Sequence, residues 1–222
     1  MSTLWQYMIS TAFRRGHYDG VVTIRELKKR GDHGLGEYAA LDGELIVVDG
    51  EFYRARSDGT IQTAVDDDPL CFAQVATLGA AEEFAAPDGL TLQNVATSFA
   101  ASQRTRNTFY LITIEGDFET VTTTVFPPQQ KPYPPLAEAN AQAVKFRFKL
   151  ETGKLVGFFS PTYMRDVGVP GYHLHFLNDQ RTGGGHVTSF ELRSGRVSLQ
   201  PIDRFSLVIS QDEDFLHADL EL

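Results

Sequence analysis

Short apolar runs bounded by turn residues make up most of this chain, and they predict strands. The clearest runs cover residues 45–48, 70–78, 109–114, 118–126, 145–149, 155–160, 196–200 and 205–210, with turns expected at residues 115–117 and at Gly153. Asp49-Gly50 lies between two apolar runs and predicts a tight hairpin, and Asp58-Gly59 predicts a second one. Strand-like runs outnumber helical ones, which favours a β-dominated α+β fold.

Helical spacing of apolar residues is confined to a few stretches. Residues 1–15 and 92–104 have this spacing, and residues 136–144 are rich in alanine and compatible with a helix. Thr23 and Glu26 stand three residues apart, as in a capping box at the start of a helix. We therefore expect a few short helices around a mainly β core.

A proline-rich segment at residues 127–135 is the main organisational boundary. The segment is short and contains an aromatic residue, which favours an ordered surface connection over a flexible linker. We expect an N-terminal β-rich α+β portion at residues 1–126 and a C-terminal β-rich portion at residues 127–222. The two portions are either tightly associated or a single domain.

Composition narrows the possible partners and the compartment. The net charge of −9 over 222 residues argues against a nucleic-acid partner, which requires a basic patch. The single cysteine, Cys71, excludes an intramolecular disulfide and a cysteine-based zinc site. No apolar run approaches membrane-spanning length and the N-terminus lacks a signal-peptide core, so we expect no membrane partner and a cytoplasmic location.

Three histidines on neighbouring strand segments form the strongest chemical pattern of the chain. Residues 171–176 read GYHLHF, and the alternation of side chains along a strand puts His173 and His175 on the same face. A glycine run at 183–185 lets the chain turn back, and His186 opens the next strand. Isolated histidines are usually surface or core residues, but three imidazoles with one open position match a catalytic zinc site.

Other polar residues carry weaker signals. Glu44 stands at the start of the apolar run 45–48, where a carboxylate is usually a surface residue at a strand end. His17 and His33 lie in turn-like surroundings, and we expect both to be exposed. Phosphate-binding loops of the GxxxxGK[ST] type and the GxSxG nucleophile motif are absent from the sequence.

Several of these segments together resemble the α-acetolactate decarboxylase family over nearly the whole chain. The segments are GHYDG at 16–20, GDHGLG at 31–36, LDGELI at 41–46, QKPY at 130–133, VPGYHLHF at 169–176 and GGH at 184–186. The resemblance implies two packed mixed or antiparallel β-sheet portions and a homodimer. It also implies zinc ligands at His173, His175 and His186, with the family's metal-side glutamate at Glu44.

The chain departs from the family pattern around the expected substrate site. Thr124 stands where the family has an active-site arginine, and Glu37 stands where it has a small hydroxyl residue. The family also has a longer C-terminal tail with a glutamate, for which Glu221 is a candidate replacement. The cations considered as substitutes for the arginine are Arg54, Arg56, Lys131 and Arg147.

The function that follows is a zinc-dependent carboxy-lyase that converts 2-acetolactate to acetoin. Zinc would act as a Lewis acid that stabilises the enediolate left by loss of CO₂, and Glu44 would supply or relay the proton that quenches it. Thr124 and Glu37 would then contact a small-molecule hydroxy-keto acid. Two alternatives stay open: a zinc enzyme of the same fold acting on a different hydroxy-ketone, and a non-catalytic relative that retains the metal.

Overall fold

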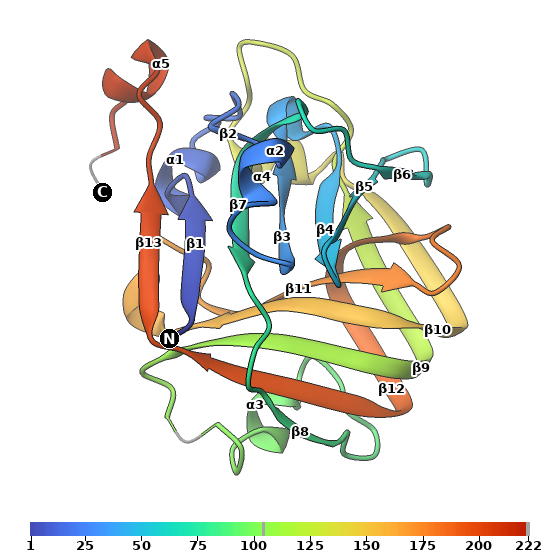
Figure 1. Cartoon of the computed structure of the whole chain (residues 1–222). Coiled ribbons are helices and arrows are strands. Elements are labelled where there is room, and N and C mark those ends of the chain that lie inside the picture. Colours follow the sequence, from blue (N-terminus) through green and yellow to red (C-terminus); the bar gives the residue numbers. More distant parts are fainter. Residues whose placement is uncertain (104, 221–222) are drawn as a thin grey trace.

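Two β-sheets packed against each other form the protein, seen in a computed structural model that describes residues 1–103 and 105–220 (Figure 1). The first sheet runs in the order β13 (Arg204–Val208), β1 (Thr3–Tyr7), β7 (Pro69–Ala76), β3 (His33–Tyr38), β4 (Glu44–Val48), β5 (Glu51–Ala55) and β6 (Ile61–Thr63), with β2 (Val22–Thr23) paired to β7. The second runs in the order β11 (Gly171–Asn178), β10 (Val144–Ser160), β9 (Phe109–Val125), β12 (Gly184–Ile202) and β8 (Glu82–Ala85).

The helices are short and lie outside the sheets (Figure 1). They are α1 (Ser10–Arg14), α2 (Ile24–Leu27), α3 (Val95–Ser98), α4 (Leu136–Asn140) and α5 (Glu213–Leu216), with 3₁₀ turns η1 (Ala39–Leu41) and η2 (Thr162–Met164). The capping box of Thr23 and Glu26 is present at the start of α2. The predicted β-dominated α+β fold with two packed sheets is confirmed.

Both predicted hairpins of the first sheet are present. Asp49 and Gly50 join β4 to β5 with φ angles of 53° and 79°, the left-handed backbone that a two-residue turn requires. Gly59, at φ 88°, lies in the turn that joins β5 to β6. These turns fix the register of β4, whose first residue, Glu44, is paired with Glu37 on β3.

Two of the predicted helices are wrong over most of their length. Residues 3–7 form β1, which pairs with β7 on one side and in parallel with β13 on the other, and helix α1 begins only at Ser10. Of the predicted helix at 92–104, only Val95–Ser98 is helical, and residue 104 lies outside the described part of the chain. Pairing with distant strands overrides the local spacing at the N-terminus, because a strand between two neighbours satisfies its backbone on both edges.

The second sheet has three very long strands where shorter ones were predicted. Strands β9, β10 and β12 are 17, 17 and 19 residues long, so the turns expected at residues 115–117 and at Gly153 are wrong. Gly116 is paired with Gly153 on one side and with Gly195 on the other. A Cβ atom at Gly116 would lie 2.1 Å from the carbonyl oxygen of Ser194, so this row of glycines permits a backbone approach that no other residue allows.

The long strands bend and close on one another at the end that carries the histidines. Strand β11 pairs with both β10 and β12, while β9 also pairs with both of them, so the four strands form a closed set (Figure 1). The sheets approach closely where Leu35 of β3 meets Gly157 of β10, at a position where a Cβ atom would lie 2.9 Å from the leucine.

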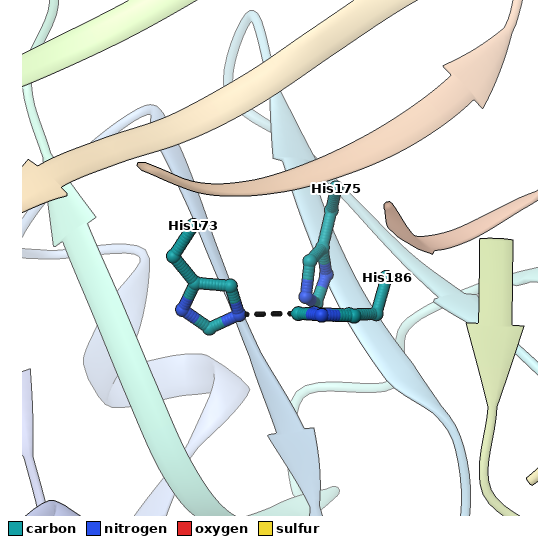
Figure 2. A group of neighbouring side chains, drawn as sticks. All are labelled: His173, His175 and His186. Atoms are coloured by element: carbon teal, nitrogen blue, oxygen red, sulfur yellow. Dashed lines mark hydrogen bonds between the residues drawn. The ribbon is translucent and has the colours of Figure 1, made fainter. Parts of the chain in front are cut away.

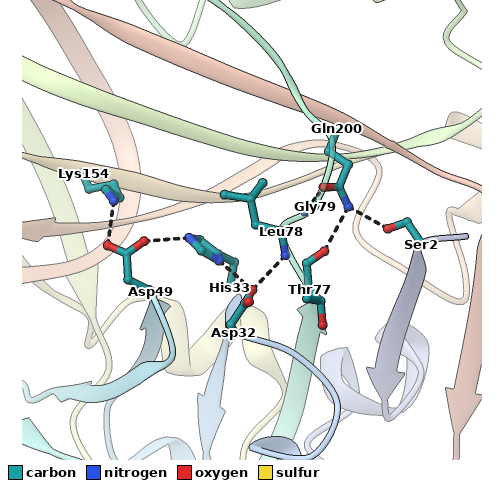
Figure 3. A network of polar contacts seen from close by, with 9 residues as sticks. All are labelled: Ser2, Asp32, His33, Asp49, Thr77, Leu78, Gly79, Lys154 and Gln200. Atoms are coloured by element: carbon teal, nitrogen blue, oxygen red, sulfur yellow. Dashed lines mark hydrogen bonds and ion pairs between the residues drawn. The ribbon is translucent and has the colours of Figure 1, made fainter.

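A polar network joins the two sheets at their edge (Figure 3). Lys154 of β10 pairs with Asp49 at 2.8 Å, and His33 lies between Asp49 at 3.2 Å and Asp32 at 2.8 Å. His33 is only 3% exposed, so the prediction that it is exposed was wrong. His33 contacts Asp49, which in turn pairs with a lysine of the second sheet more than a hundred residues away, and local pattern does not reveal these contacts.

The predicted division at residues 126/127 stays a prediction, and it does not coincide with the division between the sheets. Strands β8 and β9 precede that point and belong to the second sheet, whereas β13 follows it and belongs to the first. Within the described residues, no helix is both long enough and apolar enough to cross a membrane.

Candidate metal centre and cavity

Three imidazole rings converge on one point of the second sheet (Figure 2). The hairpin predicted by the glycine run is present: His175 of β11 is paired with His186 of β12, and His173 lies two residues before His175 on the same face. The ring centroids are 4.9 to 5.4 Å apart, and one nitrogen from each ring lies within 4.8 Å of the others. This spacing allows the three residues, hereafter the triad, to bind one metal ion.

The triad is held in the neutral state that metal binding requires. His175 donates its Nδ1 hydrogen to the carbonyl oxygen of Leu45 at 2.8 Å, which leaves the lone pair on Nε2. Burial lowers the pKa of His173 and His175 well below the ordinary value, and the neighbouring imidazoles lower both further. Burial alone lowers the pKa of His186 to about 4. All three rings are therefore uncharged at neutral pH.

A pair of buried carboxyl groups on the first sheet faces the triad. Glu37 and Glu44 are paired across β3 and β4, are 4% and 2% exposed, and Glu44 Oε2 lies 3.3 Å from His175 Nε2. Burial raises the pKa of both groups, and the charge of Glu44 raises that of Glu37 further. The pair therefore retains a proton at neutral pH and titrates as a unit. From pattern alone Glu44 was expected at the surface. The local pattern could not reveal its burial, because the second sheet that covers it is distant in sequence.

Thr124 completes the same surface. It is paired with His186 across β9 and β12, so its side chain projects to the face that carries the triad, and it is 7% exposed. Glu221, the candidate replacement for the family's tail glutamate, lies outside the described residues.

These residues close the inner end of a cavity of about 510 Å³. We call the inner end the base, formed by the triad, Glu37, Glu44 and Thr124, and the outer end the rim, formed by Ser10, Phe13 and Arg14 of α1, Leu136, Ala137 and Asn140 of α4, and residues 168–170. The volume is that of a small-molecule site. Sequence reasoning did not find the rim residues, since nothing in the short segments that carry them signals contact with the histidines.

The four cations considered as substitutes for an arginine are absent from the described lining of this cavity. Arg54 and Arg56 both pair with Asp42, and Lys131 pairs with Asp19 and Asp214. The fourth, Arg147, lies on β10 opposite Thr122. One arginine that was not considered, Arg14, does line the cavity.

The base also contains buried polar atoms without hydrogen-bond partners, as expected of a metal-binding site. His173 Nδ1, Glu37 Oε1 and Glu44 Oε1 are buried without a hydrogen-bond partner. Buried polar atoms in proteins almost always have partners, so their concentration at one point suits a bound cation and its ligands. Fold and site together define a β-rich protein that encloses a small-molecule cavity over three histidines able to hold a metal.

Comparison with known proteins gives the family. A sequence model of the alpha-acetolactate decarboxylase family matches residues 4–222. The alpha-acetolactate decarboxylase of Bacillus subtilis strain 168 is 36% identical over 223 residues, which cover 100% of this chain and 87% of the relative. That of Methanosarcina mazei is 35% identical over 216 residues, which cover 96% of this chain and 75% of the relative. The chain therefore belongs to the alpha-acetolactate decarboxylase family.

Solved structures agree with this assignment. The crystal structure of acetolactate decarboxylase from Bacillus subtilis subspecies spizizenii superposes with a TM-score of 0.96 at 34% identity, covering 99% of this chain and 95% of the other. The likeness extends over both sheets, and the resemblance inferred from the sequence motifs is confirmed.

Proposed function

We propose that this chain catalyses the zinc-dependent decarboxylation of 2-acetolactate to acetoin. Family membership makes it a carboxy-lyase of the acetolactate decarboxylase type. The observation that carries the proposal is the pairing of three neutral imidazoles with a proton-holding carboxyl pair at the base of a small cavity. Three neutral ligands suit zinc because they leave its positive charge uncompensated.

The chemistry requires an electron acceptor and a proton donor. His173, His175 and His186 would hold a zinc ion, which would supply the Lewis acidity that decarboxylation next to a ketone requires. The Glu37–Glu44 pair holds a proton at neutral pH, because burial disfavours a second negative charge. Glu44, at 3.3 Å from His175, is the group we expect to deliver that proton to the substrate carbon.

Thr124 and Glu37 are our proposed substrate contacts. Thr124 offers a hydroxyl beside His186, which can donate to a substrate oxygen. Protonated Glu37 offers a donor on the opposite wall. We keep the homodimer and the cytoplasmic location as predictions; light scattering coupled to size-exclusion chromatography tests the first.

A second candidate is a zinc enzyme of this fold acting on a less anionic hydroxy-ketone. The observation that favours it is the acidic base, where Glu37 and Glu44 together repel a substrate carboxylate whenever one of them is ionised. A non-catalytic relative that retains the metal is the remaining alternative from the sequence. The three functions differ in turnover of acetolactate and of neutral hydroxy-ketones.

The test combines metal analysis with acetoin detection from racemic acetolactate. We compare the native chain, His175→Ala and the control His217→Ala, whose side chain is 80% exposed just after the end of α5. One zinc per chain, acetoin formation, loss of both in His175→Ala and retention in the control support the proposal. Zinc without acetoin, but with turnover of a neutral hydroxy-ketone, supports the second candidate. Zinc without any turnover supports the non-catalytic alternative, and absence of metal contradicts all three.

A further inference from the structure

The rim of the cavity carries a cationic side chain, Arg14, that belongs to none of the sequence motifs. Among the described residues that line the cavity, Arg14 is the only lysine or arginine, whereas Glu37 and Glu44 are both carboxyl groups. A substrate carboxylate in this cavity needs a cationic partner, and Arg14 is the one described lining residue that offers a fixed positive charge. Arg14 is therefore the candidate partner for a substrate anion in this cavity.

The backbone that carries Arg14 is fixed to the cavity wall. In the first turn of α1, the Ser10 amide donates to the carbonyl oxygen of Val167 at 2.9 Å, and the Thr11 hydroxyl donates to that of Asp166 at 2.8 Å. The segment that accepts these bonds continues into residues 168–170, which line the rim. Arg14 thus projects from a helix that is tied to the rim at a defined position.

The guanidinium of Arg14 has N–H donors that are not used within the described residues. Its contacts with the described residues all involve Nη2, which donates to Thr11 Oγ1 and the Arg165 carbonyl oxygen at 3.3 Å and lies 3.7 Å from Asp166 Oδ1. The side chains of Arg14 and Asp166 are 44% and 51% exposed, so this ion pair is weak and exchangeable. Nε and Nη1 of Arg14 have no hydrogen-bond partner among the described residues. They can therefore serve a carboxylate, which accepts two parallel N–H···O hydrogen bonds from one guanidinium.

We propose that Arg14 binds the carboxylate of an α-hydroxy-β-keto acid at the rim, with the hydroxyl and ketone oxygens directed to the triad. This inference rests on the proposed function and assigns its substrate-anchoring cation. Because the carboxylate is charged in the bound substrate and disperses its charge as CO₂ forms, the contact stabilises the ground state at least as much as the transition state. Loss of Arg14 should raise KM and leave kcat nearly unchanged.

The first experiment measures kcat and KM for acetolactate in the zinc-loaded native enzyme, Arg14→Gln, Arg14→Lys and the control Arg15→Gln. Arg15 is the next residue but lines a separate cleft. We expect Arg14→Gln to raise KM about 10- to 100-fold, the loss typical of a hydrogen bond to a charged group. Arg14→Lys should recover part of it, and Arg15→Gln should stay within twofold. A KM for Arg14→Gln within twofold of native, or an equal rise in Arg15→Gln, overturns the inference.

The second experiment separates failure of this inference from failure of the proposed function. Calorimetry measures binding of 2,3-dihydroxy-2-methylbutanoate, an unreactive carboxylate analogue, and of neutral butane-2,3-diol. Even if the native chain proves inert toward acetolactate, weaker binding of the carboxylate to Arg14→Gln with unchanged binding of the diol supports the carboxylate anchor. Equal weakening of both ligands, or of neither, overturns it.

Discussion

The base and the rim of the cavity are built in opposite ways. Every base residue sits on a strand whose register is set by backbone pairing, as with Glu37 opposite Glu44 and His175 opposite His186. The rim is formed by two short helices and a loop, and Arg14, Ala137 and Asn140 on it are exposed. Rigid, buried strands suit chemistry that needs fixed atoms, whereas exposed helices tolerate change. We therefore expect the base to set the reaction and the rim to set which substrate enters.

The largest effect should come from removing the proton donor at the base. Glu44→Gln keeps the shape of the side chain but abolishes proton transfer, so we expect kcat to fall about 10²- to 10⁴-fold. The measurement is acetoin formation with zinc content determined in parallel, since retained zinc excludes loss of the metal as the cause. Glu51→Gln, exposed at the start of β5, is the matched control. A Glu44→Gln enzyme within threefold of native would remove Glu44 from the chemistry.

The partner carboxyl group should matter less. Glu37 is paired with Glu44 across β3 and β4, and the amide of Glu37→Gln can donate a hydrogen bond to Glu44 as a protonated carboxyl group can. We expect kcat to fall no more than about tenfold, far less than for Glu44→Gln. The pH dependence of kcat in both variants checks this assignment. A larger loss for Glu37→Gln than for Glu44→Gln would reverse the two roles.

The second sheet should also depend on the glycine row where its long strands approach closely. Gly116→Ala places a Cβ atom 2.1 Å from the Ser194 carbonyl oxygen, and we expect it to reduce the free energy of unfolding by about 1–3 kcal/mol or more. Urea unfolding measures the loss. Gly79→Ala is the control, because the nearest atom to its added Cβ would be 3.5 Å away, an ordinary contact. Equal stability of the two variants would mean that the row does not constrain the sheet.

Sequence pattern predicted the parts of the base that depend on local rules. Alternation along β11 put His173 and His175 on one face, and the glycine run before His186 predicted the return strand. The burial of Glu44 and its approach to His175 depend on packing between sheets, which period-two alternation does not encode. Gly116 and Gly153 were interpreted as turn residues. In the sequence alone, a glycine that pairs with another glycine inside a sheet cannot be distinguished from a glycine in a turn.

The rim was not predictable for a related reason. Helix α1 contributes Arg14 only because β1 pairs between β7 and β13 and delivers the helix to the loop at 166–170. The N-terminal segment was expected to be one helix, so its side chains could not be placed on any surface. His33 was misplaced in the same way, since its partner Asp49 and the lysine that pairs with Asp49 come from other elements.

A modest effect should come from the polar network that joins the two sheets at their edge. Burial alone would raise the pKa of Asp49, but Lys154 and His33 outweigh it and lower the pKa below 3.8. The stability contributed by Asp49 is therefore complete above pH 3.8 and is lost as the pH falls through the lower folded value. Because Asp49 is largely exposed, we expect Asp49→Asn to cost no more than about 1 kcal/mol at pH 7. Urea unfolding at pH 7 and pH 3 should show the difference from native shrinking at the lower pH; a constant difference would assign the cost to packing.

The smallest effect should come from a neutral residue of the rim. Asn140 is exposed on α4, and its amide is uncharged, so a contact with substrate contributes little after exchange with water. We expect Asn140→Ala to change KM for acetolactate by about twofold, against the 10- to 100-fold rise expected for Arg14→Gln. Measuring both variants under the same conditions tests whether charge, rather than shape, governs entry. If Asn140→Ala raised KM as much as Arg14→Gln, the rim would select substrate by its packing as a whole, and the charge of Arg14 would not be the determinant of substrate entry.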